Sequence, residues 1–115
     1  MTSVYREDGR LIIAAAEPAA TAWQRARGLI GRPALPPGRA LLLAPCRAVH
    51  TGFMRFPLDL IFFSRDGRIV RRRDGVPPFR LAWGGRRAWG VLELAAGWLP
   101  GPAAQPGDRL VFHDA

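Results

Sequence analysis

The residues best placed to carry chemistry begin with a cysteine and a histidine four positions apart. Cys46 and His50 are the residue types that form a thiolate–imidazole nucleophile. This spacing brings two side chains together on a helix, but Pro45 and the alternation of apolar residues predict loop and strand here. Two side chains at this spacing on a strand lie too far apart for a hydrogen bond. We therefore expect a small buried thiol beside an ordinary polar histidine, and the catalytic dyad is the weaker alternative.

A second candidate group is centred on Asp59, the one charged residue in the apolar run 58–63. A carboxylate on a covered strand needs a partner, because leaving it unpaired costs several kcal/mol. We predict a binding site formed by His50, Arg55 and Asp59. For Asp59 itself we favour a structural role, in which it accepts backbone N–H bonds and pairs with Arg55 or with the Arg27–Gly28 turn.

Glu93 is the other carboxylate in an apolar strand, and we add it as the fourth candidate binding residue. Asp59 and Glu93 in one cleft would resemble the paired carboxylates of a glycosidase. A small hydrolase using Asp59 with Glu93 or His50 is therefore an alternative function. Because no complete catalytic set is present, we expect a binding or interaction module, more so than an enzyme, with an unknown small molecule or protein as its partner.

Metal-binding patterns are weak in this sequence. Cys46, His50, His113 and Asp114 are potential ligands, but none forms a tight pair such as C-x-x-C or H-x-x-x-H. We therefore expect neither a metal site nor a cofactor.

The net charge of +8 suggests a polyanionic partner at first sight. All 17 basic residues are arginine, however, and Ala, Gly and Pro are abundant, which is typical of biased codon usage. The basic excess is also spread over both halves of the chain. These features indicate that the positive charge reflects the overall amino-acid composition of the chain and not a polyanionic partner.

The interval from Arg71 to Trp89 is the most basic part of the chain. It holds six arginines and one acid, interleaved with Phe79 and Trp83. Arginines with exposed aromatic residues are typical of single-stranded nucleic-acid binding, so a binder acting through the Arg71–Arg87 face is a further alternative. We expect instead a solvated loop with one or two tryptophans packed under it, and no nucleic-acid partner.

The central structural element is the run LDLIFF at residues 58–63, which we predict to be a strand beginning just after Pro57. Side chains alternate along a strand, so both faces of this run are mostly apolar. A strand of this kind is covered on both sides and is not an edge. Asp66-Gly67 then predicts a tight hairpin turn, after which Ile69 and Val70 pair back.

Further strands are predicted on both sides of this hairpin. They cover residues 4–6, 10–13, 40–44, 89–94 and 109–112, and a loop leads through 79–80 into a Gly84-Gly85 turn. One short helix is predicted from Pro18 to Arg27, with Gly28 as its C-terminal stop. Gly and Pro exclude regular structure in 30–39 and 97–106. The fold class is mainly β: an antiparallel, jelly-roll-like β-sandwich or barrel, since parallel pairing would need a helix between strands.

The size of the chain, 115 residues, predicts a single globular domain over residues 1–115. No apolar stretch approaches the roughly 20 residues of a membrane span, and no export signal is recognisable. We expect a soluble protein located in the cytoplasm.

A family resemblance is carried by segments that follow one another in a fixed order: RGLIGR, LPPG, ALLLAPC, VHTGFMRFPLDLIFF, RDGRIV, PPFR, VLELAAG and PGDRL. From about Ala20 to Phe112 the chain resembles the prokaryotic family called domain of unknown function 192. The resemblance implies a jelly-roll-like β-sandwich, and it implies no catalytic residue or ligand. Gly28, Asp59 and Glu93 stand at positions that the family pattern shares.

Overall fold

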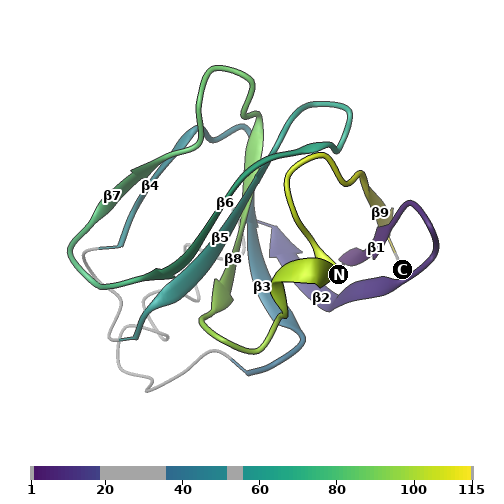
Figure 1. Ribbon diagram of the computed structural model, residues 1–115, viewed down its shortest axis with the longest axis horizontal. Helices are drawn as coiled ribbons and strands as arrows, with labels where there is room; N and C mark the ends of the chain where they lie inside the picture. Colours follow the sequence, from purple (N-terminus) through teal and green to yellow (C-terminus); the bar gives the residue numbers. More distant parts are fainter. Residues whose placement is uncertain (1, 19–35, 52–55, 115) are drawn as a thin grey trace.

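The computed structural model describes residues 2–18, 36–51 and 56–114, and within them it is almost entirely β-structure (Figure 1). Its elements are β1 (Thr2–Arg6), β2 (Leu11–Pro18), β3 (Arg39–Leu43), β4 (Ala48–His50), β5 (Leu58–Phe63), β6 (Ile69–Val76), β7 (Leu81–Trp83), β8 (Gly90–Ala95), the short 3₁₀ helix η1 (Gly101–Ala103) and β9 (Leu110–Asp114). The prediction of a mainly β fold is confirmed.

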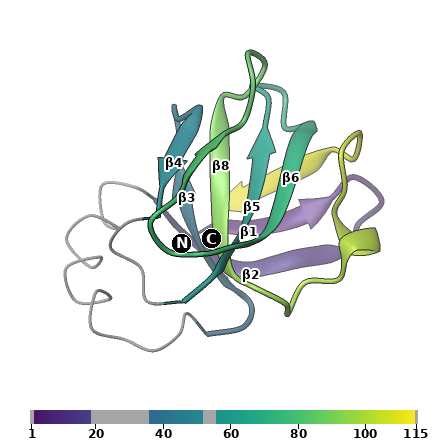
Figure 2. The ribbon, with the colours of Figure 1, turned by 60° about the vertical axis from the view of Figure 1, so that its left-hand side comes forward.

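Seven of these strands form one curled sheet in the order β6-β5-β8-β3-β2-β1-β9. In Figure 2, β1, β2 and β9 run across the direction of β5, β6 and β8, which shows how far the sheet curls into a half-barrel. Strands β4 and β7 pair separately as a two-stranded sheet, which we call the flap. The flap stands apart from β1 and β9, at the other end of the molecule (Figure 1).

Strand β5 lies between β6 and β8, and all six of its side chains are buried. On one face, Ile61 and Phe63 belong to a core built from the curled sheet and η1, which we call the barrel core. On the other face, Leu58, Leu60 and Phe62 belong to a second core that includes residues of the flap, which we call the flap core. The prediction of a strand covered on both sides is confirmed.

The Asp66-Gly67 turn joins β5 to β6 and also closes the curl of the sheet. Gly67 has φ +89°, a conformation that favours glycine, and a Cβ at this position would lie 2.4 Å from the carbonyl oxygen of Leu110. The backbone N–H of Leu110 donates to the Gly67 carbonyl at 2.8 Å, and Ile69 donates to Asp108 at 2.8 Å. The turn therefore binds the segment that leads into β9, which lies at the opposite edge of the sheet.

The pairing of β2 with β3 departs from the all-antiparallel expectation. These strands are parallel, with Ala16 opposite Ala40, whereas the other strand pairs are antiparallel. A long connection makes a parallel pair feasible, and residues 19–38 supply it. The predicted helix falls in this connection; Pro18 is the last residue of β2, and the remainder of the predicted helix lies outside the described residues.

The burial of β5 generates a first testable prediction. Phe62 is fully buried, and a Cβ added to Gly84 at the end of the flap would lie 2.2 Å from its ring. Phe62→Ala should lower the free energy of unfolding by about 3–5 kcal/mol, because it leaves a cavity between the sheet and the flap. Chemical denaturation measures this loss. Leu11→Ala, at a half-exposed position, is the control, and a loss for Phe62→Ala below about 1 kcal/mol would contradict the assignment of the flap core.

Candidate functional site

The two predicted carboxylates, Asp59 and Glu93, lie on adjacent strands but on opposite faces of the sheet. In the pairing of β5 with β8, Asp59 is opposite Leu94 and Glu93 is opposite Leu60. Side chains directly opposite each other point to the same face, and successive residues alternate. Asp59 therefore points to the barrel core, where Leu94 lies, and Glu93 points to the flap core with Leu60. The two carboxylates cannot act together in one cleft as a glycosidase pair does.

His50 is not brought to Asp59 either. His50 is exposed at the end of β4, next to Val49, whose side chain packs into the flap core. Alternation along β4 places the His50 side chain on the outer face of the flap. Arg55 lies outside the described residues. The described structure thus places His50, Asp59 and Glu93 in three different environments.

Asp59 is 2% exposed and is satisfied by groups of the fold itself. Its Oδ1 accepts the backbone N–H of Gly75 at 2.8 Å, and its Oδ2 accepts that of Gly97 at 3.1 Å. The Nη2 atom of Arg72 lies 3.9 Å from the same Oδ2 atom. These partners link β5 to the end of β6 and to the loop after β8. The environment of Asp59 is that of a structural carboxylate.

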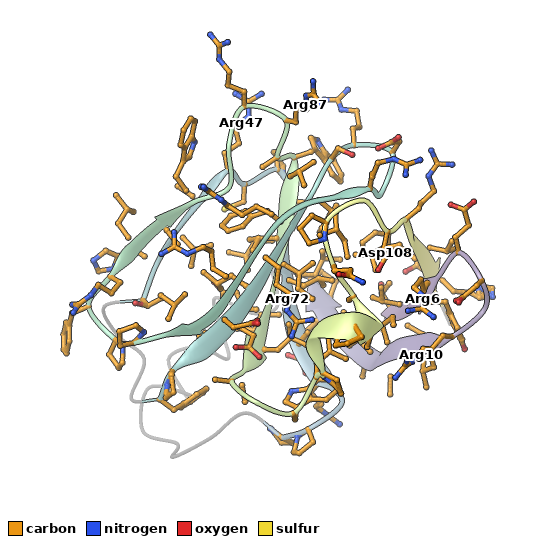
Figure 3. All side chains as sticks on the ribbon, viewed as in Figure 1. Arg6, Arg10, Arg47, Arg72, Arg87 and Asp108 are labelled. Atoms are coloured by element: carbon orange, nitrogen blue, oxygen red, sulfur yellow. The ribbon has the colours of Figure 1, made fainter. Side chains whose placement is uncertain are left out.

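Arg72, the cationic partner of Asp59, is itself buried, and it points from the middle of β6 toward η1 (Figure 3). Its guanidinium donates to the carbonyls of Leu99 at 2.6 Å and Ala104 at 2.8 Å, and its Nε donates to Asp74 at 2.7 Å. From the sequence, we had assigned Arg72 only to a basic run of residues. Alternation along a strand could have distinguished Arg72 from Arg71 and Arg73, because only the middle one of these three side chains points inward.

Glu93 has the opposite character, because it is buried without a partner. The residue is 7% exposed in the middle of β8, and its neighbours across the sheet are Leu60 of β5 and Leu41 of β3. Within the described residues, no hydrogen bond or ion pair involves Glu93. Burial alone raises the pKa of Glu93 to about 7. A carboxyl group in this state changes its charge near neutral pH.

Cys46 packs at the edge of the flap core. Its thiol is half-buried and donates to the carbonyl of Ala48 at 3.0 Å. Burial raises the pKa of the Cys46 thiol, and the charge of Glu93 acts in the same direction. A thiol with a raised pKa is the reverse of an activated nucleophile. His50 points away from it, so Cys46 and His50 do not form a dyad.

The described residues contain no group of three or more His, Cys, Asp or Glu side chains that could hold a metal ion. They also contain no helix long and apolar enough to cross a membrane. A surface hollow of about 500 Å³ is lined by Arg6, Glu7, Asp8, Gly107, Asp108 and Arg109. Its charges pair with one another, as in Arg6 with Asp8 at 2.6 Å, so this hollow is a set of surface ion pairs.

The interval from Arg71 to Trp89 differs from the solvated loop that we expected. It contains the end of β6 and all of β7, and Trp83 is exposed on the flap. Trp89 follows the expectation in part, since it packs against Phe63. The apolar alternation of Phe79, Leu81 and Trp83 is visible in the sequence as the pattern F-R-L-A-W, but we did not predict a strand from it.

The comparisons with known proteins agree with this fold. The model of the DUF192 family, described as an uncharacterized ACR, matches residues 4–112, a longer range than the expected start near Ala20. No curated protein matches the chain significantly.

Two solved structures are similar along nearly the whole chain. One is a protein of Sinorhizobium meliloti 1021 provisionally named a transcription regulator, with 24% identity, a TM-score of 0.73, and coverage of 96% of this chain and 91% of the other. The second is a protein of unknown function from Novosphingobium aromaticivorans DSM 12444, with 20% identity, a TM-score of 0.72, and coverage of 96% and 82%. At these identities the similarity establishes the fold alone.

The environment of Asp59 predicts a large loss of stability on substitution. Asp59→Asn should lower the free energy of unfolding by about 3 kcal/mol, because the amide turns a donor toward an N–H group and leaves Arg72 without its buried anion. Asp74→Asn is the matched control, since this exposed carboxylate also binds Arg72 and its loss should cost less than about 1 kcal/mol. A double-mutant cycle with Arg72→Met should give a coupling of about 0.5–3 kcal/mol. Strictly additive losses would disprove the pairing.

The raised pKa of Glu93 predicts how stability depends on pH. The unfolded chain ionises this group near pH 4.5 and the folded chain near pH 7, so the folded state binds the proton more tightly and stability falls as pH rises between these values. Glu93→Gln should therefore match the wild type at pH 4.5 and exceed it by up to about 3 kcal/mol at pH 8. Urea denaturation across this range tests the difference. Glu7→Gln, at an exposed position, should show no such difference.

Proposed function

We propose that this chain, which belongs to the uncharacterized DUF192 family, is a binding module whose flap-core face of the sheet, around Glu93, receives a small ligand with an apolar body and a hydrogen-bond donor or cation. This is a binding function and not a catalytic one. The separate environments of Asp59, Glu93 and His50 support binding over hydrolysis.

A single observation carries the proposal: Glu93 is buried with no partner among the described residues. Neither oxygen of Glu93 is among the fully enclosed side-chain atoms that lack a hydrogen-bond partner, so the carboxyl keeps some contact with solvent. A carboxylate this nearly buried is still costly without a partner. Asp59, one strand away, shows how this fold satisfies a carboxylate that serves the scaffold. The different treatment of Glu93 supports a role toward a ligand, since perturbed pKa values gather at functional sites.

The chemistry of the ligand follows from the surroundings of Glu93. Leu41 and Leu60 flank the carboxyl across the sheet, and the half-buried Cys46 thiol lies nearby. Aliphatic side chains offer no hydrogen bond, so specificity must come from the carboxyl group itself. Once ionised it accepts hydrogen bonds and attracts a cation, and charge-assisted bonds of this kind are about twice as strong as neutral ones. An alkylamine is the simplest molecule with both properties.

The test uses hexylamine as the probe and hexanol and hexanoate as matched controls with a neutral and an anionic head. The side-chain carboxyl of Glu93 is followed by NMR during a pH titration. Bound hexylamine stabilises the carboxylate and should therefore lower the pKa of Glu93 from its value of about 7. Glu93→Gln should weaken hexylamine binding roughly tenfold or more, since it removes a charge-assisted bond.

Two results would reject the proposal. One is equal binding of hexylamine, hexanol and hexanoate, which would mean that the carboxyl group takes no part. The other is an unchanged pKa of Glu93 at saturating hexylamine. Asp74→Asn serves as a charge-matched control, because it removes one exposed negative charge and should leave hexylamine binding unaltered.

A further inference from the structure

The outer face of the flap exposes three large apolar side chains. Phe79, Leu81 and Trp83 occupy alternate positions, and their exposed fractions are 75%, 72% and 55%. In the pairing of the flap strands, Leu81 is opposite His50 and Trp83 is opposite Ala48. Leu81 and Trp83 therefore share one face of the flap. Together with exposed Phe79, which precedes β7 in a bend, they form what we call the outer flap face. Single exposed apolar residues are ordinary, but a contiguous group marks an interaction surface.

The backbone at Phe79 points to the same conclusion. Phe79 has φ 63°, a left-handed conformation that is uncommon for a bulky residue. Fully buried Thr51 holds this turn: its carbonyl accepts the Phe79 N–H at 3.2 Å, and its Oγ1 accepts the Arg80 N–H at 2.9 Å. Packing of the Phe79 ring does not compensate for this backbone strain, because the ring is exposed to solvent. Strained residues of this kind gather at ligand contacts.

The charges around the outer flap face are of one sign. Four exposed arginines belong to the flap or to the loops at its ends: Arg47, Arg80, Arg86 and Arg87. Segments 44–51 and 75–92 contain no Asp or Glu. Arg47 and Arg87 project from the loops at one end of the flap (Figure 3), where the Nε of Arg47 binds the carbonyl of Ala88 at 3.1 Å. Bonds to carbonyls leave the positive charge uncompensated.

We propose that the outer flap face binds the surface of an anionic lipid membrane, with Phe79, Leu81 and Trp83 entering the headgroup region and the arginines contacting lipid phosphates. Aromatic and aliphatic side chains combined with arginines are the composition of interfacial membrane anchors. A second copy of the chain fits poorly, because two faces of the same charge repel. A nucleic acid also fits less well, since Leu81 stands between the two aromatic residues and offers no ring for a base.

The test is co-sedimentation with vesicles of phosphatidylcholine alone and of phosphatidylcholine with phosphatidylglycerol. The wild type should bind the anionic vesicles, and binding should weaken as salt screens the arginines. The double variant L81S/W83S should lose binding by roughly tenfold or more, because it removes the apolar contact. Both side chains are more than half exposed, so the variant should keep the thermal unfolding midpoint of the wild type. L11S, at an exposed apolar position on β2, should bind as the wild type does.

A second variant separates the charge from the apolar contact. R80Q/R86Q should bind the anionic vesicles less tightly and with a weaker dependence on salt. Equal binding of the wild type to neutral and anionic vesicles would overturn the proposal, and so would the absence of binding by the folded wild type. Binding to single-stranded oligouridylate without binding to vesicles would assign the face to nucleic acid instead. A concentration-dependent dimer abolished in L81S/W83S would assign it to self-association.

Discussion

The complete burial of β5 is the constraint on which the rest of the structure depends. Six consecutive side chains without access to water require cover on both faces of the sheet. The curl of the sheet supplies the barrel core on one face, and the flap supplies cover on the other. The close approach of Gly84 to Phe62 shows how tightly the flap is seated. In this chain the two small cores share β5.

Burial has contrasting consequences for the two carboxylates on neighbouring strands. Asp59 receives two backbone N–H groups and the charge of Arg72, so its burial organises loops that are distant in sequence. Glu93 receives none of these within the described residues, and its proton affinity rises. The difference arises from the two faces: the barrel core has loop backbone near Asp59, whereas the sheet around Glu93 presents aliphatic side chains. The fold thus stabilises one acid and leaves the other responsive to its surroundings.

The local parts of this fold could be predicted from the sequence, and the long-range parts could not. The alternation in LDLIFF and the Asp66-Gly67 turn specify β5 and its hairpin with β6, because both depend on neighbouring residues. The parallel pairing of β2 with β3 depends on a connection of about twenty residues, for which alternation gives no direction.

The same limit applies to the candidate site. The sequence identified Asp59 and Glu93 as unusual acids, but only the register of β5 with β8 shows that they face opposite ways. Likewise, Arg72 could not be assigned to Asp59 without knowing where the loop after β8 lies. Short strands such as β4 carry too few residues for a periodic pattern, so the pairing of β4 with β7 could not be predicted.

Because β1 lies between β2 and β9, it cannot complete its pairing until late in the synthesis of the chain on the ribosome. β2 follows β1 directly and can pair with it early, but Thr2 to Arg6 also pair with Asp114 to Leu110, at the other end of the sequence. Contacts between residues so far apart in sequence form late, and they reduce the rate of folding. During synthesis, β1 therefore exposes one unpaired edge until residues 110–114 have emerged, and such an edge invites association with other nascent chains. The half-barrel can close only after translation of its last strand.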